Sequence, residues 1–527
     1  MLVGPILKNA SSFIQNRNAS QSRLFEDQVQ VQAELLEKIL SKAKKTEFGK
    51  HYGIEDVLRS PTQMQTYKQH VPIFQYDYMF KKWWHKTLSG MEDVTWPGRI
   101  ENFALTSGTT NSSSKKIPVS KQMIKAIKKT AISQVSSLSN LTLPASFFEK
   151  DVLCVGGSTD LNKINNQYEG DLSGILTGKV PHWLNPFTKP GKKVRAISNW
   201  DEKLEKMIEL APKWDVGIIC GVPAWVQILI KGILERYQLK SIYEIWPNLR
   251  IYIHGGVAFK PYLQSFNALF KDQVIYLDSY LASEGFLGFQ EATSTHMKLN
   301  INHGIYFEFV PFDLNHFDGE GNLKQFSDAL HLGEVDENTE YAVLITTVSG
   351  AFRYLIGDTI KFTNLADLSF TITGRTKHFL SFCGEHLSVD NMNEAISQLS
   401  YEKWIKIDEF AVVGSQLPNG NFKHKWYIAS NDPINKYNFK FDLDNKLCQL
   451  NDDYKTERGH ALEEIQLEIL PPHIFYDFLK LIDKYGSQHK FPRVLKGSLA
   501  SDWERYIQIM EEENAKLMVG WQSGSWM

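Results

Sequence analysis

The chain has 527 residues, of which 43% are hydrophobic and 22% charged, and this ordinary globular composition excludes a chain that is disordered throughout. Its 58 lysine and arginine residues nearly balance its 60 aspartate and glutamate residues, which argues against a protein that grips nucleic acid through a basic surface. The four cysteines contain no C-x-x-C pair, so neither a disulfide framework nor a zinc site is indicated, and we expect a cytoplasmic protein.

The expected elements begin with an amphipathic helix at residues 24–43, where apolar side chains recur at three- and four-residue spacing. The apolar stretch at the start of the chain is broken by Pro5 and makes a poor signal peptide. The most apolar window, residues 216–234, has the length of a membrane span but is interrupted by Pro223 and Lys231. We therefore expect a buried strand that runs into a buried helix, and no membrane segment.

Further along the chain, apolar runs alternate with helical patterns. The expected strands lie at residues 151–158, 216–223, 249–256 and 273–280. Such alternation indicates βαβ units and a largely parallel sheet, whereas residues 304–312 and 341–362 are typical of hairpins. Because the pattern changes near Gly374, we predict an α/β fold with a large multi-sheet N-terminal domain, residues 1–374, and a small α+β C-terminal domain, residues 375–527.

A run of small hydroxyl residues occupies residues 105–120, with the sequence LTSGTTNSSSKKIPVS. Hydroxyl groups, a glycine that lets the backbone approach closely, and terminal lysines suit a loop that grips phosphate. The run is not a Walker A motif, and it is equally typical of a polar Ser/Thr linker.

The segment YLASEG, residues 280–285, directly follows one of the expected strands. Ligands of α/β sheets bind beyond the carboxyl ends of strands. At that place the Tyr280 ring can stack on a base, and Glu284 can hold Mg²⁺ against phosphate oxygens. The same pattern also fits an ordinary strand exit with a solvated glutamate.

Two further motifs are Gly357-Asp358 and Gly374-Arg375. An aspartate at such a turn can accept hydrogen bonds from two ribose hydroxyls, although Gly-Asp is also a common β-turn pair. The second motif lies at the predicted domain boundary. Each of the four motifs is weak alone, but their order and spacing together are distinctive.

In combination, these motifs resemble the adenylate-forming superfamily of acyl-CoA synthetases, luciferases and peptide-synthetase adenylation domains. More narrowly, the chain is similar to the Gretchen Hagen, or auxin-responsive promoter, family of acyl-acid amido synthetases, through blocks such as TSGTT, YEGDLSGIL, GVPAW, YLASEG and GAFRYLIGDTIKF. The resemblance implies a ligase that uses ATP and Mg²⁺ to turn a carboxylic acid into an acyl-adenylate, which an amine, usually an amino acid, converts to an amide. It implies small-molecule partners, and neither nucleic acid nor a membrane.

The resemblance also assigns roles to individual residues. Glu284 would place Mg²⁺, Asp358 would hold the ribose hydroxyls, and Lys115 would supply cationic charge to the phosphates. The other nucleotide-binding residues that it implies are Ser107, Gly108, Thr109 and Thr110 around the β/γ-phosphates, Gly255, Gly256 and Tyr280 at the adenine, Ser283 near the phosphate, and Arg375 at the ribose or phosphate.

The chain departs from the family pattern at two positions. Ser112 stands where family members usually have glycine, which bears on the mobility of the loop. Leu355 replaces the arginine of the superfamily's Tyr-Arg-x-Gly-Asp motif, whereas Arg353 matches an arginine common in the narrower family. Any role of the missing arginine is therefore filled elsewhere or absent.

For the C-terminal domain, the resemblance implies a rotation about a hinge near Lys377. It also implies a lysine that acts in adenylation, for which Lys490 is the first candidate and Lys496 the second. The catalytic residues that we predict are thus Lys490, Glu284 and Arg375.

The acid would bind at the start of the buried strand–helix segment. Val222, Trp225 and Val226 are the expected walls of its pocket, with Tyr168 and Ser173 nearby. Apolar residues in such a segment are also typical of plain core.

Other chemistries lack their motifs. No G-x-S-x-G and no H-E-x-x-H is present, so neither a nucleophile-elbow hydrolase nor a zinc hydrolase is supported. His254 and His386 are candidate bases for the amine but are equally typical of structural histidines. Two alternatives to an amide synthetase stay open: an acyl-CoA ligase with the same first step, and a non-catalytic nucleotide-binding or scaffold relative.

Overall fold

The computed structural model describes residues 25–523 except 107–114, 165, 181, 272, 319–320, 326, 377–379, 381–386, 418–421, 452–453, 456–457, 459–461 and 484–490. The described residues form two compact units, the first ending at Thr376 and the second beginning at Leu380. The roles of the two predicted domains, adenylation and rotation, stay predictions.

The first unit begins with helices that cover one end of the large core. In α2 (Phe25–Ala43), the buried residues include Leu36, Ile39 and Leu40, so the amphipathic helix expected at residues 24–43 is confirmed. The helices that follow are α3 (Glu47–His51), α4 (Ile54–Arg59), α5 (Gln63–His70), α6 (Tyr76–Met79) and α7 (His85–Leu88). Helix α6 matters for the site, because it carries Tyr76.

A small sheet contains the strands on either side of the hydroxyl-rich run. Its order is β2-β1-β5-β4, with β1 (Asn102–Thr106) antiparallel to β2 (Lys115–Val119) and parallel to β5 (Gln167–Gly170). Strand β4 (Asn162–Ile164) pairs with the outer edge of β5. Because side chains alternate along a strand, Lys115 and Lys116 point to opposite faces of β2.

The large sheet has twelve strands in the order β13-β12-β14-β15-β16-β11-β10-β9-β8-β7-β3-β6. Its parallel part consists of β3 (Asp151–Val155), β6 (Thr188–Lys189), β7 (Val216–Gly221), β8 (Ile251–Gly255) and β9 (Ile275–Ala282). Its antiparallel part consists of β10 (Gly285–Gln290), β11 (Met297–Leu299), β12 (Ile305–Pro311), β13 (Leu330–His331), β14 (Glu340–Thr347), β15 (Tyr354–Asn364) and β16 (Ser369–Arg375). The four predicted parallel strands and the predicted hairpins are therefore confirmed.

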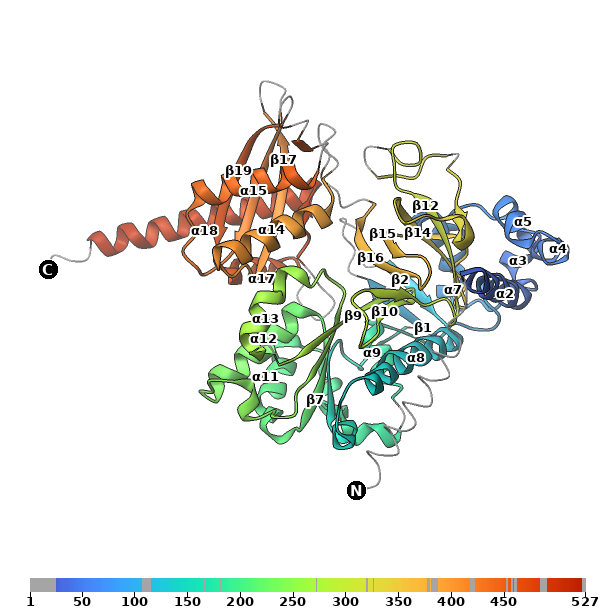
Figure 1. The fold of residues 1–527 in the computed structure, drawn as a ribbon, viewed down its shortest axis with the longest axis horizontal. Helices are drawn as coiled ribbons and strands as arrows, with labels where there is room; N and C mark the ends of the chain where they lie inside the picture. Colours follow the sequence, from blue (N-terminus) through green and yellow to red (C-terminus); the bar gives the residue numbers. More distant parts are fainter. Residues whose placement is uncertain are drawn as a thin grey trace. The chain divides into compact units, whose positions relative to one another are not determined.

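The strand order reverses between β3 and β7, because the chain runs from β3 outward to β6 and then returns to the other side of β3. In open α/β sheets, ligands bind beyond the carboxyl ends of strands at such a reversal. Figure 1 shows α11 (Trp200–Leu210), α12 (Pro223–Arg236) and α13 (Leu263–Phe270) on one side of these strands and α8 (Lys121–Ser136) on the other. Two short helices, α9 (Leu172–Thr177) and α10 (Lys192–Arg195), lie along the chain between β5 and α11.

The apolar window at residues 216–234 forms β7 and most of α12, as predicted. Pro223 occupies the first turn of α12, where its missing N–H has no helical partner to lose. Among the residues that the structure describes, no helix combines the length and the apolar character needed to cross a membrane.

The second unit is a sheet between two helical layers. The sheet has the order β19-β18-β17-β20 and comprises β17 (Glu409–Gln416), β18 (Phe422–Ala429), β19 (Leu462–Leu470) and β20 (Val494–Leu495). Phe410 and Val412 pack with α14 (Val389–Lys403) and α15 (Lys436–Leu450), whereas Ala411 and Val413 pack with α17 (Pro472–Leu481) and α18 (Gly497–Ser523). The predicted fold class, a large multi-sheet α/β part followed by a small part of mixed type, is confirmed.

Candidate active site

The site is centred on Asp358 in β15, which contacts two other predicted residues. The Tyr280 hydroxyl, from β9, donates to Oδ2 of Asp358 at 2.6 Å. The Nε of Arg375, at the end of β16, donates to Oδ1 at 2.7 Å. Asp358 and Arg375 are direct partners in the β15–β16 ladder, so strand register sets this ion pair. Arg375 is 44% exposed and thus open to a ligand on its other side.

Glu284 lies in the tight turn between β9 and β10 and is only 9% exposed. Burial raises the pKa of its carboxyl to about 7, and the negative charge of Asp358 adds to this rise. The charges of Lys115 and Arg375 oppose the rise. Two carboxylates and two cations, from β15, β16, β2 and the turn after β9, therefore interact electrostatically.

Two tyrosines complete this group of interacting residues. Burial raises the pKa of Tyr354 and the charge of Glu284 adds to the rise, whereas the Tyr76 hydroxyl accepts a hydrogen bond from the Lys116 backbone N–H at 2.8 Å. The Nζ of Lys115 lies 5.1 Å from the centroid of the Tyr76 ring, a cation–π distance. Neither tyrosine was given a role from the sequence, although Tyr354 lies in the block GAFRYLIGDTIKF that carried the family resemblance.

The neighbouring lysine has a different environment. Lys116 donates to both oxygens of the buried Glu169, at 2.6 and 2.8 Å. The strand therefore directs one lysine of the pair toward Glu284 and the other into an ion pair of the small sheet.

The two adjacent lysines allow a matched comparison. We expect Lys115→Ala to lower acid-dependent pyrophosphate release by about tenfold or more, or ~1.4 kcal/mol of transition-state stabilisation, with an unchanged thermal midpoint. We expect Lys116→Ala to lower the thermal midpoint instead, because it leaves the buried Glu169 carboxylate unpaired, which costs about 1–3 kcal/mol of stability. Equal effects of both variants on pyrophosphate release would contradict this division.

The predicted glycines and Ser283 have identifiable local surroundings. A Cβ on Gly255 would lie 2.3 Å from the Ser279 carbonyl oxygen, so the close approach of β8 and β9 requires glycine there. Gly256 has a φ of +84°, a conformation that favours glycine. The Tyr280 ring is buried and lies 6.2 Å from the Phe370 ring, between centroids. The adenine contacts of these three residues, and the phosphate contact of the partly buried Ser283, stay predictions.

Several predicted residues lie outside the described residues: Ser107, Gly108, Thr109, Thr110, Ser112, Lys377, His386 and Lys490. Lys496 is described and follows β20 in the second unit. His254 is buried, and its ring stacks on Phe259 with centroids 3.9 Å apart, which is a packing role.

The chain matches three domains of one family. These are the GH3 family N-terminal domain over residues 19–161 and 130–275, the GH3 family central domain over residues 299–374, and the GH3 family C-terminal domain over residues 389–498. This chain belongs to the GH3 family. The resemblance drawn from the sequence is thereby confirmed.

Curated relatives of this GH3 protein are distant. Indole-3-acetic acid-amido synthetase GH3.4 of Arabidopsis thaliana is 24% identical over 385 residues, which cover 65% of this chain and 61% of that protein. Jasmonoyl--L-amino acid synthetase JAR6 of Nicotiana attenuata is 23% identical over 401 residues, which cover 64% of this chain and 67% of that protein. The first match thus spans less than two thirds of its relative's length.

Solved structures share the fold. The GH3.15 acyl acid amido synthetase superposes with a TM-score of 0.73 at 16% identity, covering 92% of this chain and 94% of that chain. A 2-hydroxyisobutyryl-CoA ligase in the postadenylation state superposes with a TM-score of 0.57 at 12% identity, covering 92% and 91%. At these identities the likeness is one of fold alone.

The residues predicted to bind the acid lie in different surroundings in this GH3 protein. Val222 caps the start of α12 at the carboxyl end of β7, whereas Trp225 and Val226 are fully buried, with Trp225 packed on Trp200. Ser173 lies in α9, where its hydroxyl accepts the N–H of Gly157, just beyond β3, at 2.9 Å. Tyr168 lies in the small sheet and is 39% exposed. Val222 therefore directly follows β7, Ser173 contacts the residue pair that follows β3, and the acid pocket itself stays a prediction.

One buried lysine near the reversal of strand order between β3 and β7 was not predicted from the sequence. The Nζ of Lys203, in α11, donates to the carbonyl oxygens of Gly156 and Gly157 at 2.9 Å and of Arg195 at 3.3 Å. Burial lowers the pKa of Lys203 to about 8. The three acceptors explain why a lysine is tolerated there, and they fix the turn that follows β3.

Arg353, the arginine shared with the narrower family, is remote from this chemistry. Its buried guanidinium pairs with Glu308 at 3.0 Å and donates to the carbonyl oxygens of Lys68 and Val71. Leu355, at the position of the superfamily's arginine, is buried among apolar side chains. Arg353 therefore fastens the segment before α6 to the large sheet and does not replace the missing arginine.

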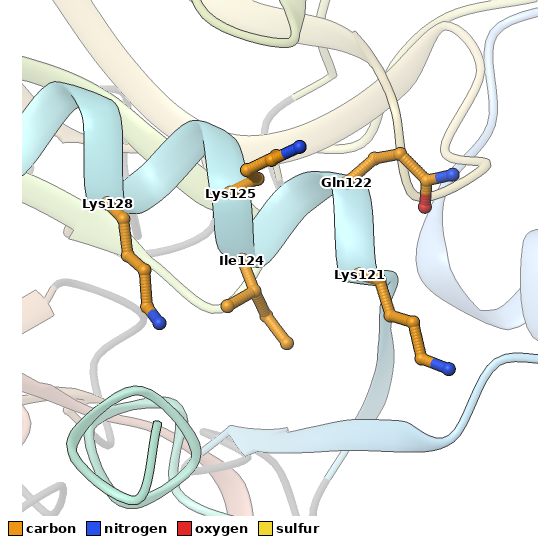
Figure 2. A pocket seen from close by; sticks show the side chains of 5 residues that line it. All are labelled: Lys121, Gln122, Ile124, Lys125 and Lys128. Atoms are coloured by element: carbon orange, nitrogen blue, oxygen red, sulfur yellow. The ribbon is translucent and has the colours of Figure 1, made fainter. Parts of the chain in front are cut away.

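A groove of about 350 Å³ runs along α8 and is lined by Lys121, Gln122, Ile124, Lys125 and Lys128, as Figure 2 shows. Lys121 pairs with Glu101 at 2.7 Å, and Lys128 donates to the Lys179 carbonyl oxygen at 2.5 Å. None of the predicted site residues lines this groove.

Proposed function

We propose that this GH3 protein is an ATP-dependent ligase that activates a carboxylic acid as an acyl-adenylate and transfers the acyl group to an amine, forming an amide. The observation that carries the proposal is that Glu284, Asp358 and Arg375 of the large sheet and Lys115 of the small sheet act on one another electrostatically. The names of the curated relatives, which are amido synthetases, support the amide as the product.

In this proposal, the carboxylate oxygen of the acid attacks the α-phosphorus of ATP, and the bond to the β-phosphate oxygen breaks to release pyrophosphate. The amine nitrogen then attacks the acyl carbon, and AMP leaves. The protein's task is to hold two anions together and to oppose the charge that develops between them. Lys115 and Arg375 supply positive charge, and each oxygen of Asp358 keeps a lone pair for a ribose hydroxyl.

The carboxylate of Glu284 fits Mg²⁺ by the chemistry of its donor atoms. Within the described ranges, no three His, Cys, Asp or Glu side chains gather into a metal cage. A small number of protein ligands suits Mg²⁺, which proteins hold through one or two carboxylates while water and phosphate fill the other positions. When bound, Mg²⁺ would neutralise charge on the phosphate oxygens. Glu284 is the residue that we propose as its ligand.

The amine that we propose is an amino acid, because the curated relatives include a jasmonoyl-L-amino acid synthetase. The acid that we propose is a small carboxylic acid, and we propose that it binds near the reversal of strand order between β3 and β7. We also propose that the C-terminal part rotates between the two half-reactions, with Lys490 acting in the first of them.

A second candidate is an acyl-CoA ligase, which the fold likeness to 2-hydroxyisobutyryl-CoA ligase favours. The test is to supply ATP·Mg²⁺ and a panel of aryl and alkyl acids, and then an amino acid mixture, coenzyme A or hydroxylamine. We expect acid-dependent pyrophosphate release and an amide with an amino acid. A thioester with coenzyme A and no amide would favour the second candidate. The absence of acid-dependent pyrophosphate release would favour a non-catalytic nucleotide-binding scaffold.

The pKa of Glu284 predicts a pH dependence. Since that pKa is about 7, the carboxylate that we propose as the Mg²⁺ ligand is lost as the pH falls through 7. We expect pyrophosphate release at subsaturating Mg²⁺ to decline on acidification through this range. Saturating Mg²⁺ is expected to move the decline to lower pH, because the cation favours the ionised carboxylate. A profile unchanged by Mg²⁺ concentration would contradict the assignment.

A further inference from the structure

Two cysteines lie side by side in the parallel part of the large sheet. Cys154 in β3 and Cys220 in β7 are direct partners in the ladder, so their side chains point to the same face. Both cysteines are partly exposed, whereas Leu153 and Ile219, one residue earlier on the same strands, are fully buried.

The geometry suits a covalent link. Neighbouring strands run about 4.8 Å apart, and disulfides join Cα atoms separated by about 4.4–6.8 Å. A bond between these two sulfurs therefore needs no rearrangement of the sheet. The two thiols also differ in reactivity: the neighbouring Cys220 thiol, with help from the charge of Arg195, lowers the pKa of Cys154, whereas the pKa of Cys220 is raised. Cys154 is thus the better nucleophile.

We propose that Cys154 and Cys220 form a dithiol site that a low-molecular-weight disulfide, such as glutathione disulfide, converts reversibly into an intramolecular disulfide. The Cys154 thiolate attacks one sulfur of the oxidant, whose S–S bond breaks and releases one thiol. Cys220 then attacks the Cys154 sulfur and releases the second thiol. The protein loses two electrons and two protons, and the oxidant becomes two thiols.

The site lies where the large sheet reverses. Cys154 precedes by two residues the Gly156-Gly157 turn that Lys203 and Ser173 hold, and Cys220 precedes by two residues Val222 at the start of α12. A disulfide therefore ties together the two strand ends on which we propose that the acid binds. This consequence, unlike the bond itself, rests on the proposed function. It predicts a higher KM for the acid and an unchanged KM for ATP in the oxidised protein.

The experiment uses the full chain, incubated with glutathione disulfide and mapped by mass spectrometry under non-reducing conditions. We expect a cross-linked pair of peptides containing Cys154 and Cys220, and we expect dithiothreitol to reduce the disulfide that joins them. Cys448→Ser, a substitution on α15 of the second unit, serves as the matched control and is expected to cross-link like the wild type. Cys154→Ser and Cys220→Ser are expected to lose the cross-link and to keep glutathione on the remaining thiol.

The outcomes separate this inference from the proposed function. Wild-type protein that carries only glutathione adducts, or no modification, at Cys154 and Cys220 would overturn the dithiol site. A cross-link that leaves the KM for the acid unchanged would keep the dithiol site and contradict the placement of the acid. Reduced protein that releases no pyrophosphate with any acid would contradict the proposed function alone.

Discussion

Replacing Glu284 by glutamine is expected to lower acid-dependent pyrophosphate release by about 100-fold or more while the protein stays folded. Glutamine keeps the size of the side chain but removes the charge that would hold Mg²⁺. The neighbouring carboxylate, Asp358, already accepts hydrogen bonds from Tyr280 and Arg375 and is not expected to replace the lost ligand.

The stability of this variant provides an independent readout. The pKa of Glu284 in the folded protein is about 7, above the ordinary value of 4.5, so folding favours its protonated form. That contribution to the free energy of unfolding is fully present below pH 4.5 and is lost as the pH rises through 7. Above pH 7, Glu284→Gln is therefore expected to have a thermal midpoint at least as high as the wild type.

Glu291→Gln is the matched control, because this glutamate follows Glu284 by one strand and pairs with Lys298 near the surface. It is expected to release pyrophosphate like the wild type. A Glu284→Gln variant with near wild-type release would show that the site is wrongly assigned, and one that fails to fold would show that the charge is structural.

Replacing Arg353 by methionine is expected to lower the free energy of unfolding by about 3–5 kcal/mol, because it leaves Glu308 buried without its cation. The backbone at Arg353 adds to the constraint, since its φ of +41° is unusual for a residue with a side chain. Its N–H donates to Thr346, and its carbonyl accepts the N–H of Phe74. Urea denaturation with a two-state fit measures the loss.

The double variant Arg353→Met/Glu308→Leu sharpens this prediction. Removing both charges is expected to recover most of the lost stability, because a buried ion pair contributes little beyond the cost of burying its charges. A single variant that loses less than about 1 kcal/mol would contradict the structural role of Arg353. A double variant less stable than the single one would show that Glu308 has other partners that matter more.

The parallel strands and the central motifs were predictable because local signals set them. The apolar runs at residues 151–158 and 273–280 are too short for helices and end at glycine or polar residues. The length of each run and its flanking residues are therefore enough to predict a strand. Glu284 and Asp358 stood out because a carboxylate directly beyond a strand or in a glycine turn is chemically suggestive by itself. Strand register then brings Asp358 and Arg375 together without any further signal.

The residues that sequence reasoning missed depend on contacts between distant segments. Lys203 looks like any helix lysine until the fold buries it against three carbonyl oxygens. Tyr76 gains its role only because α6 packs near β2. Cys154 and Cys220 appear scattered along the chain and become neighbours only through the ladder of β3 and β7. None of these pairings has a periodic or short-range signature.

The most direct measurement is a crystal structure of the full chain with Mg²⁺ and a non-hydrolysable ATP analogue. The account predicts ribose hydroxyls bonded to the carboxylate of Asp358, phosphates near Lys115, and a metal ion ligated by Glu284. A nucleotide seated elsewhere, such as in the lysine-lined groove of α8, with Asp358 still bonded only to Tyr280 and Arg375, would contradict it.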